Sequence, residues 1–223
     1  ERCEPGARRP GKLAQVTRSA TRPPPHAPWI TRGFTPKPSM PRVVLTGGPG
    51  VGKTTLLREL GSLGYAVVEE SARALIRERT AAGRSPRPDA LEFAREILRR
   101  DMAKYEQAAE SARWMFFDRS PLEALAMVQE AAPMPVSEVE ALIVSFRFHR
   151  TVFVLRPWPG IYARDSERDH SLGHCVAVHK HLVAWYGRCG YQLHAVPCLP
   201  PAARAQHVLQ ILGNPANPAQ VFA

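Results

Sequence analysis

The chain has 223 residues, 44% of them hydrophobic, which is enough for one α/β domain with a full core but not for a second domain of comparable size. Its net charge is +10, but residues 1–40 hold six Arg and two Lys against two Glu, so +6 of the total lies there and only +4 on the rest. We therefore expect no nucleic-acid binding by the folded part.

The composition also predicts the cellular compartment of the protein. The four cysteines form no C-x-x-C pair, as in many proteins of a reducing compartment. No apolar run approaches the ~18 residues of a membrane span, and the first residues lack the apolar centre of a signal peptide. We expect a cytoplasmic protein without a membrane-spanning segment.

Residues 1–40 contain eight prolines, scattered arginines and few clustered apolar residues. Such a segment buries too little surface to offset the entropy cost of ordering it, so we predict a disordered basic tail. The alternative is a basic tail that contacts anionic surfaces. Because Met40 immediately precedes the first predicted strand, it is an expected alternative start of the chain.

Residues 42 to 60 predict a phosphate-binding unit made of a strand, a glycine-rich loop and a helix. Residues 42–46 are mostly apolar, residues 56–60 continue at helical spacing, and the loop between them fits G-x-x-x-x-G-K-[ST]. Glycines let backbone N–H groups turn toward phosphates, and the helix N-terminus adds a partial positive charge. The alternative is a glycine-rich turn without a ligand. The predicted nucleotide-binding residues are Gly48, Pro49, Gly50, Val51, Gly52, Lys53, Thr54 and Thr55.

Two residues of this loop carry specific chemistry. Lys53 is predicted to contact the β and γ phosphates, and the hydroxyl of Thr54 is predicted to ligate Mg²⁺. The expected ligand is ATP or GTP, and the choice between them stays open because the sequence contains no N-K-x-D-type motif that would read the base.

After the loop, apolar strands alternate with amphipathic helices, which is the pattern of a parallel sheet covered on both faces. We predict one domain over residues 41–213, and we expect the proline-rich residues 214–223 to fray. Further strands are predicted at residues 65–68, 114–117, 151–155 and 191–196, and the last helix at about residues 202–212.

Two helix starts are predicted from capping residues. Asp89 with Glu92 predicts the start of a long helix after the loop at residues 83–88. Ser137 with Glu140 predicts a capping box before another apolar helix face.

Acidic residues close the second predicted strand, at the sheet edge that also carries the phosphate loop. Glu69 and Glu70 follow this strand directly, and Arg73 comes three residues after Glu70. One of the glutamates is predicted to hold a substrate hydroxyl or to act as its general base, because phosphoryl transfer needs an aligned acceptor oxygen. The alternative is a solvated pair of Glu70 and Arg73 on the helix surface.

Asp118 ends the apolar strand at residues 114–117, at the edge where ligands bind in open α/β sheets. We predict that its carboxylate lies beside the metal ligated by Thr54; the alternative is a cap of the helix that begins at Pro121. The next residue, Arg119, is predicted to neutralise phosphate charge, with pairing to a surface acid as the alternative.

Residues 156–169 follow the fourth strand and are rich in Arg and Asp, which predicts a loop or lid. Arg156, Arg164 and Arg168 are candidates to stabilise charge on the transferred phosphoryl group when the lid closes. The alternative is that they pair with the neighbouring acids in an ordinary solvated loop.

The helix predicted from about Ser171 to Gly187 contains Cys175 and His179 one turn apart, within a stretch of several histidines. This spacing suggests a metal site. The two residues share a helix face with apolar neighbours, however, so we favour a packed helix face.

Several of these stretches resemble one family when they are taken together. The small AAA-type ATPase domain related to the nicotinamide riboside kinase part of NadR, within the wider P-loop kinase fold, is similar to nearly all of residues 41–213. The element Asp118-Arg119-Ser120 also looks like the D/E-R-S element of deoxynucleoside kinases, in which the acid and the arginine serve the metal and the phosphates. The stretches that carry the resemblance are residues 46–55, 67–73, 116–120, 162–168 and 186–197.

The resemblance implies a three-layer α/β P-loop fold with a mainly parallel five-stranded sheet in the order 2-3-1-4-5, and a mobile lid. It also implies ATP or GTP at the loop, with Mg²⁺. Lys53 and Thr54 match the phosphate and metal positions, Asp118 matches the acid of the third strand, and Glu70 with Arg73 matches an E-x-x-R pair.

Two functions follow from these expectations. In the first, the protein is a kinase that transfers the γ-phosphoryl group to a small, nucleoside-like hydroxyl acceptor held by Glu70, Arg73 and Asp118. In the second, it is a regulatory module in which bound nucleotide orders the lid and hydrolysis is slow. The lid arginines and the acids at two strand ends favour the kinase.

The predicted domain boundary can be tested by limited proteolysis of the full chain. Residues 1 to about 40 should be removed quickly, because an unpacked segment exposes its backbone to the protease, and a stable fragment starting near residue 41 should remain. Rapid cleavage inside the phosphate loop, detected by mass spectrometry of the fragments, would contradict the domain assignment.

Overall fold

The computed structural model describes residues 41–108, 113–161 and 171–213. The predictions made for residues 1–40, for residues 214–223, and for Arg164 and Arg168 in the lid lie outside the described residues.

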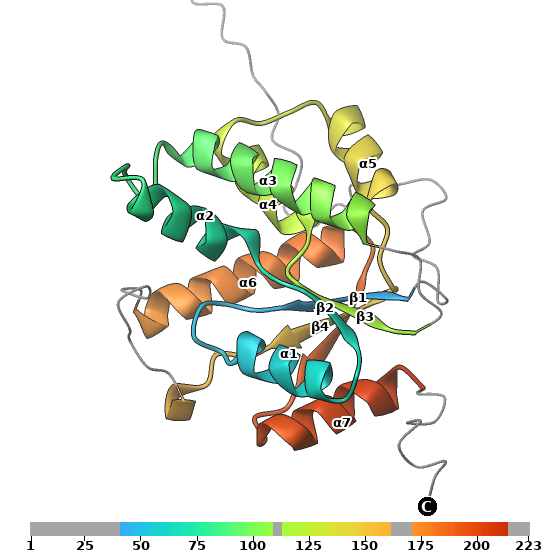
Figure 1. Cartoon of the computed structure of the whole chain (residues 1–223). Coiled ribbons are helices and arrows are strands. Elements are labelled where there is room, and N and C mark those ends of the chain that lie inside the picture. The colour runs from blue at the N-terminus through green and yellow to red at the C-terminus, as the bar shows by residue number, and fades with distance from the viewer. Residues whose placement is uncertain (1–40, 109–112, 162–170, 214–223) are drawn as a thin grey trace, which may run out of the picture.

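A five-stranded sheet forms the centre of the domain, with every strand pair parallel and the strands in the order β2-β3-β1-β4-β5 (Figure 1). This confirms the predicted fold class and strand order. The strands are β1 (Arg42–Thr46), β2 (Ala66–Val68), β3 (Met115–Asp118), β4 (Thr151–Leu155) and β5 (Gln192–Val196).

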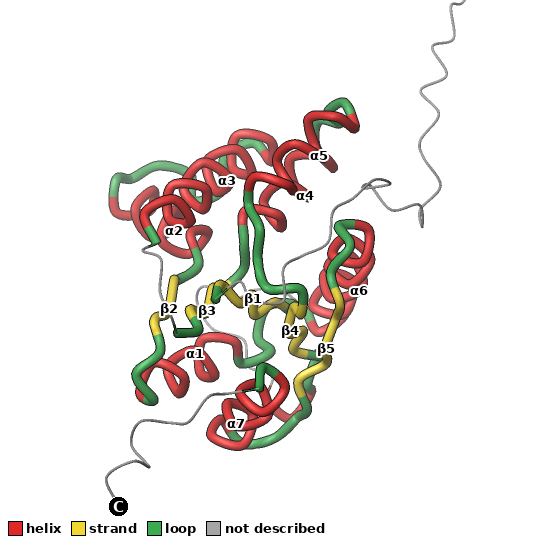
Figure 2. The backbone as a smooth tube through the Cα atoms, turned by 90° about the vertical axis from the view of Figure 1, so that its right-hand side faces the viewer, coloured by secondary structure: helices red, strands yellow, loops and turns green. Residues whose placement is uncertain are grey.

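Helices cover both faces of the sheet, which gives the predicted three layers. Figure 2 shows α1 and α7 on one face, and α3, α4, α5 and α6 on the other. Among the described residues, no helix is long and apolar enough to cross a membrane. The helices are α1 (Lys53–Ser62), α2 (Ser71–Ala81), α3 (Ala90–Gln107), α4 (Pro121–Ala131), α5 (Val136–Ser145), α6 (Leu172–Arg188) and α7 (Pro201–Ile211), with a short 3₁₀ turn, η1, at Pro159–Ile161.

The central strands are apolar on both faces because each face meets a helical layer. In β1, Val43 and Leu45 pack in the cluster on the α1 and α7 side, whereas Val44 between them packs in the cluster on the opposite side. Phe116 and Phe117 of β3 divide in the same way. This alternation fixes which way each strand-end side chain points, including those that lead into the phosphate loop.

One predicted helix start is confirmed and the other is wrong. The carboxylate of Asp89 accepts hydrogen bonds from the backbone N–H groups of Leu91 and Glu92, 2.9 and 3.1 Å long, and so caps α3. Ser137 is not a cap, because α5 already begins at Val136. The carbonyl of Pro135 accepts the first backbone hydrogen bonds of that helix instead.

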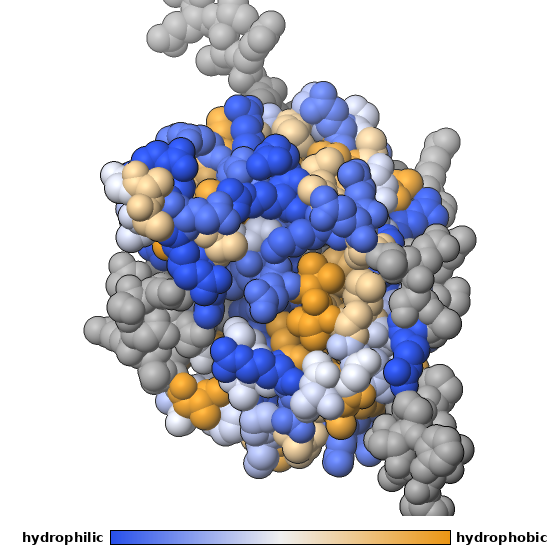
Figure 3. Space-filling view, in the orientation of Figure 1, coloured by the Kyte–Doolittle hydropathy of each residue, from blue (hydrophilic) through white to orange (hydrophobic). Residues whose placement is uncertain are grey.

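The outer surface of α2 and α3 is hydrophilic (Figure 3). Ion pairs link the two helices: Arg100 contacts Glu78 at 2.7 Å, and Arg79 contacts Glu92 at 3.3 Å. Because the glutamate of each pair is more than half exposed to solvent, each pair contributes little to stability. The helices are held to the domain by their buried faces, where Leu75 of α2 meets Ile97 of α3.

Asp101 is the one acidic residue among the buried residues of α3. Its side chain is 8% exposed, and burial raises the pKa of its carboxyl from 3.8 to about 6. The folded state therefore holds this proton more tightly than the unfolded chain does. It follows that Asp101 weakens the fold as the pH rises through about 4 to 6 and the carboxylate becomes charged.

Asp101→Asn should consequently stabilise the fold in a pH-dependent way. The free energy of unfolding, variant minus wild type, should be near zero at pH 4 and should rise to about 1–3 kcal/mol at pH 7.5, because the variant never carries the buried charge. Urea unfolding at both pH values measures it. The exposed Glu106 on the same helix provides the control, Glu106→Gln, which should show little difference at either pH. An equal Asp101→Asn effect at both pH values would contradict the assignment.

Candidate functional site

The loop between β1 and α1 has the backbone shape that the motif predicts. Gly52 immediately precedes α1 with a φ of +84°, in the left-handed region that favours glycine. Gly48 is required for a different reason: a Cβ at this position would lie 2.6 Å from the sulfur of Cys175. The buried Cys175 of α6 therefore packs directly against the loop, which supports the packed helix face that we favoured over a metal site.

Lys53 is buried at the start of α1, and its side chain extends back to the beginning of the loop. Nζ donates hydrogen bonds to the carbonyls of Gly47 and Gly48, 2.8 and 3.0 Å long. Burial and, to a lesser degree, the nearby Arg119 lower the pKa of Lys53 to about 8. A cation held this way, with two weak neutral partners, is well placed to exchange them for phosphate oxygens.

Asp118 lies beside the loop because of the strand register. Its Cα pairs with that of Leu45 in the parallel ladder, so β3 ends next to the end of β1. The carboxyl is buried, its Oδ1 has no hydrogen-bond partner among the described residues, and burial raises its pKa. The alternative role as a helix cap is not what the structure shows, because Ser120 is the N-cap residue of α4.

Thr54 and Asp118 offer oxygen ligands that fit Mg²⁺. Magnesium takes one or two protein oxygens together with phosphate and water oxygens, and the unpartnered Oδ1 of Asp118 is an oxygen of this kind. Within the described residues, no cluster of three or more His, Cys, Asp or Glu side chains could hold a metal by itself. A metal at this site would accordingly need the nucleotide to complete its coordination.

Arg119 follows Asp118 in a left-handed conformation, with a φ of +73°. This turns its side chain toward two glutamates: Nε donates to Glu70 at 2.9 Å, and Nη1 donates to Glu123 at 2.5 Å. Burial opposes the charge on Arg119, but the two carboxylates raise its pKa above the usual range. Arg119 thus pairs with the buried Glu123 and the half-buried Glu70, rather than with the surface acid that we considered as an alternative.

Glu70 lies between two arginines at the start of α2. In addition to the bond from Arg119, Arg73 contacts it at 3.3 Å, so the predicted i, i+3 pair is formed. Burial favours the protonated acid, but Arg119, Lys53 and Arg73 together lower the pKa of Glu70 below its usual value. Glu70 is therefore a carboxylate held next to Lys53 and Asp118, not a freely solvated acid.

Glu123 extends the cluster into the core. Its Oε1 accepts a hydrogen bond of 3.0 Å from the hydroxyl of Tyr186 on α6, and this hydroxyl lies 2.7 Å from Oγ of Ser120. All three side chains are buried. They fix the position of Glu123, and through it the direction of Arg119.

The structure brings some of the predicted residues together and leaves others apart. Lys53, Glu70, Asp118 and Arg119 form one cluster of charges beside the loop, in which each affects the pKa of others. The side chain of Glu69, in contrast, is exposed, and its carbonyl accepts a hydrogen bond from Lys104. Arg156 is also exposed.

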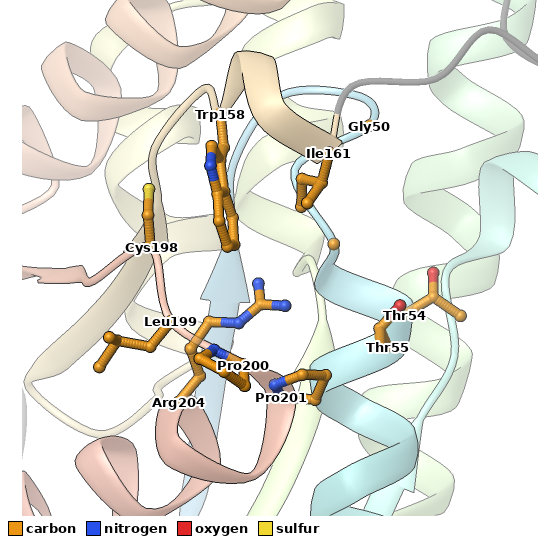
Figure 4. Close-up of a pocket in the computed structure, with 11 residues that line it drawn as sticks. Gly50, Thr54, Thr55, Trp158, Ile161, Cys198, Leu199, Pro200, Pro201 and Arg204 are labelled. Carbon is orange, nitrogen blue, oxygen red and sulfur yellow. The ribbon is translucent and has the colours of Figure 1, made fainter.

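A pocket of about 530 Å³ opens at the other side of the loop (Figure 4). One wall is the loop and the start of α1, and the opposite walls come from the turn after β4 and from the segment between β5 and α7. Its volume falls within the ~300–1,000 Å³ range of small-molecule sites. The lining residues are Gly50, Gly52, Thr54, Thr55, Trp158, Ile161, Cys198, Leu199, Pro200, Pro201 and Arg204.

Several residues of the site were missed from the sequence. Glu123 stands four residues after Arg119 in a helix, a spacing that favours ion pairs, so this contact had a signal. Tyr186, Trp158 and Arg204 had none, because they come from distant segments that only the folded sheet places near the loop.

A family model described as an AAA domain matches residues 42–204. No curated protein matches the chain.

Solved structures of kinases share the fold. The deoxyadenosine kinase from M. mycoides with bound dATP is 15% identical, with a TM-score of 0.52 over 78% of this chain and 100% of that one. The same enzyme with products bound is 16% identical, with a TM-score of 0.55 over 77% of this chain and 98% of that one. The thymidylate kinase from Ehrlichia chaffeensis is 13% identical, with a TM-score of 0.50 over 79% of this chain and 100% of that one. At such identities the likeness shows the fold, that of P-loop kinases.

The lowered pKa of Lys53 predicts how nucleotide binding depends on pH. Contact with phosphates favours the charged lysine, so above pH 8 the free protein must take up a proton to bind. Affinity for Mg²⁺-ATP or Mg²⁺-GTP should therefore be nearly flat from pH 7 to 8 and fall by up to about tenfold per unit above it. Calorimetric titration in buffers with different ionisation enthalpies measures both affinity and proton uptake.

Two variants of Lys53 control for the other groups that titrate in this range. Lys53→Arg stays charged and should bind with little pH dependence above pH 8. Lys53→Ala should bind at least about tenfold more weakly at pH 7, because it lacks the charge on the β and γ phosphates, and this difference should shrink above pH 8 as the wild-type lysine loses its charge. Parallel pH profiles for the wild type and Lys53→Arg would contradict the role given to Lys53.

Proposed function

The chain belongs to the AAA domain family, and from this membership and the charge cluster beside the loop we propose that it is a Mg²⁺-dependent kinase. It transfers the γ-phosphoryl group of ATP or GTP to a hydroxyl of a small, nucleoside-like acceptor. The observation that carries this proposal is the carboxylate of Glu70, fixed by Arg119 at 2.9 Å and Arg73 at 3.3 Å, in the same cluster as Lys53 and Asp118. A nucleotide-binding module without an acceptor has no evident need for an acid fixed in this position.

The nucleotide would bind along the loop and the pocket. The triphosphate would lie against the backbone N–H groups of the loop, with Lys53 at its β and γ phosphates and Thr55 near the start of the helix. Thr54 and Asp118 would hold Mg²⁺, which neutralises phosphate charge when it is bound. The base would enter the pocket beside Trp158.

The acceptor would lie between the loop and the ends of β2 and β3. Its hydroxyl donates a hydrogen bond to Glu70, which aligns the oxygen with the γ phosphorus. As the new P–O bond forms and the bond to the β-γ bridging oxygen breaks, Glu70 takes the hydroxyl proton and the nucleoside diphosphate leaves. Because nearby cations keep the pKa of Glu70 low, its main contribution is to orient the hydroxyl, and proton transfer comes late.

The charge balance favours an uncharged acceptor over a phosphate monoester. Among the described residues, the two arginines that contact Glu70, Arg73 and Arg119, are both already paired with carboxylates. A phosphorylated acceptor would bring about two more negative charges next to Glu70 and Asp118 without a free partner among these two arginines. A nucleoside or another riboside avoids this cost.

The remaining predicted residues take supporting roles in the proposal. Arg164 and Arg168 would close over the transferred group and help to exclude water. Glu69 would contact substrate from the rim of the site, since its side chain is exposed. The proposed relation to nicotinamide riboside kinases makes that riboside one candidate acceptor.

Label transfer from γ-labelled ATP or GTP tests the kinase directly. The full chain is incubated with Mg²⁺ and a panel of nucleosides, deoxynucleosides and ribosides, including nicotinamide riboside, and the labelled products are separated. Transfer to at least one acceptor is expected. Glu70→Gln should reduce its rate by about 100-fold or more, because the aligned acid is lost, and Asp118→Asn should abolish most of it.

The exposed Glu78 supplies a matched control, since Glu78→Gln makes the same chemical change on the surface of α2, away from the loop. This variant should transfer label at the wild-type rate. Nucleotide affinity of Glu70→Gln should stay within about threefold of wild type, which separates the acceptor role from nucleotide binding. Label released only as inorganic phosphate, at a rate that no acceptor changes, would contradict the kinase and favour a regulatory module.

A further inference from the structure

Arg204 is a buried cation in the pocket next to the loop. It comes from the first turn of α7, is 4% exposed, and points toward the indole of Trp158, whose ring centroid lies 5.7 Å away (Figure 4). Its Nη1 donates one long hydrogen bond, 3.4 Å, to the carbonyl of Val51, and its Nε has no partner within the described part of the chain. Such a guanidinium is costly to bury unless a ligand supplies acceptors.

The position of Arg204 indicates which part of a nucleotide it would meet. Lys53 bonds the carbonyls at the beginning of the loop, whereas Arg204 contacts its end, where a Cβ at Gly52 would lie 2.9 Å from Nη1. The pocket continues from there to Trp158 and Pro200. A nucleotide with its phosphates in the loop would therefore bring its base, not its γ-phosphate, to Arg204.

Apart from Thr54 and Thr55 at the start of α1, the pocket wall offers few side chains that could accept a hydrogen bond from a base. Ile161, Leu199, Pro200 and Pro201 have apolar side chains, and the indole of Trp158 is only a donor. Cys198 contributes a thiol, which is a weak acceptor. These surfaces suit the flat faces of a base, while the strong side-chain polarity at this end of the pocket comes from the donors of Arg204.

We propose that Arg204 makes the site selective for guanine nucleotides, an inference that rests on the proposed nucleotide-binding function. Guanine presents two adjacent acceptors, O6 and N7, which match the paired N–H groups of a guanidinium. Adenine presents N7 next to an amino group, so one arginine donor would face another donor. GTP is thus the phosphoryl donor that this pocket favours.

Competition among natural bases tests the selectivity on the unmodified full chain. Dissociation constants are measured with Mg²⁺ for GTP, ITP and ATP by calorimetry. GTP should bind about tenfold or more tightly than ATP, the discrimination expected of a bidentate contact. ITP keeps O6 and N7 but lacks the 2-amino group, so its affinity should be close to that of GTP. ATP affinity equal to or above that of GTP would overturn the proposal.

Substitutions at Arg204 then locate the selectivity. Arg204→Gln should lower GTP affinity and raise ATP affinity, because a carboxamide pairs with N6 and N7 of adenine. Arg204→Lys keeps the charge without the paired donors and should lose about tenfold of the GTP preference. The control is Arg58→Gln, the same change at an exposed position of α1, which should leave the GTP-to-ATP ratio unchanged. Circular dichroism confirms that each variant is folded.

Two further outcomes would be informative. If Arg204→Gln weakened GTP and ATP by the same factor, Arg204 would contact the phosphates, and the inference of base selectivity would be wrong while nucleotide binding stood. If the wild type bound none of the three nucleotides with Mg²⁺, the proposed function would fail, and the selectivity with it.

Discussion

A group of buried and half-buried charges lies beside the phosphate loop, and the architecture around the loop depends on their mutual pairing. Arg119 bonds both Glu70 and Glu123, and Lys53 lies close to Glu70 and Asp118. Removing one member of such a pair is destabilising, because it leaves part of the partner's charge without its neighbour in a poorly solvated place. The cluster therefore constrains α2, α4 and the end of β3 to one relative arrangement.

The parallel sheet brings these charged residues close to one another. The carboxyl ends of parallel strands lie at the same edge of a sheet. β3 pairs with β1 on one side, where Asp118 is opposite Leu45, and with β2 on the other. The acids that follow β2 and the loop that follows β1 therefore lie at the same edge. Tyr186, from the far helix α6, anchors the inner end of the cluster through Glu123. Phosphate-binding loop and acid cluster are thus two parts of one preformed edge, which is the condition for aligning an acceptor without large rearrangement.

Local sequence patterns predicted the fold well because the pattern is repetitive and each element depends on its own residues. Local residue patterns predicted the phosphate loop, the five strands and the cap at Asp89. The strand order was predicted from the family resemblance. The start of α5 was mistaken because Ser137 and Glu140 fit a capping box, whereas the N-cap residue of the helix is Pro135, two residues earlier. The position of Asp118 was predictable, since it depends only on a strand ending in an acid.

Contacts between distant segments were not predictable. Tyr186 is 63 residues from Glu123, and Arg204 is 153 residues from Val51, so no local spacing relates them. The choice of Glu70 over Glu69 likewise depends on which of two adjacent side chains turns inward after β2. Such choices are made by packing and charge pairing in the folded domain, which a single sequence does not display.

We propose that the loop and the acid cluster form one site that is in place before nucleotide binds. A crystal structure with Mg²⁺ and a non-hydrolysable GTP analogue tests it most directly. We predict that Nζ of Lys53 leaves the carbonyls of Gly47 and Gly48 for a phosphate oxygen, while Arg119 keeps its bonds to Glu70 and Glu123. A nucleotide bound away from the loop, or an Arg119 that breaks from both glutamates to reach the phosphates, would contradict the account.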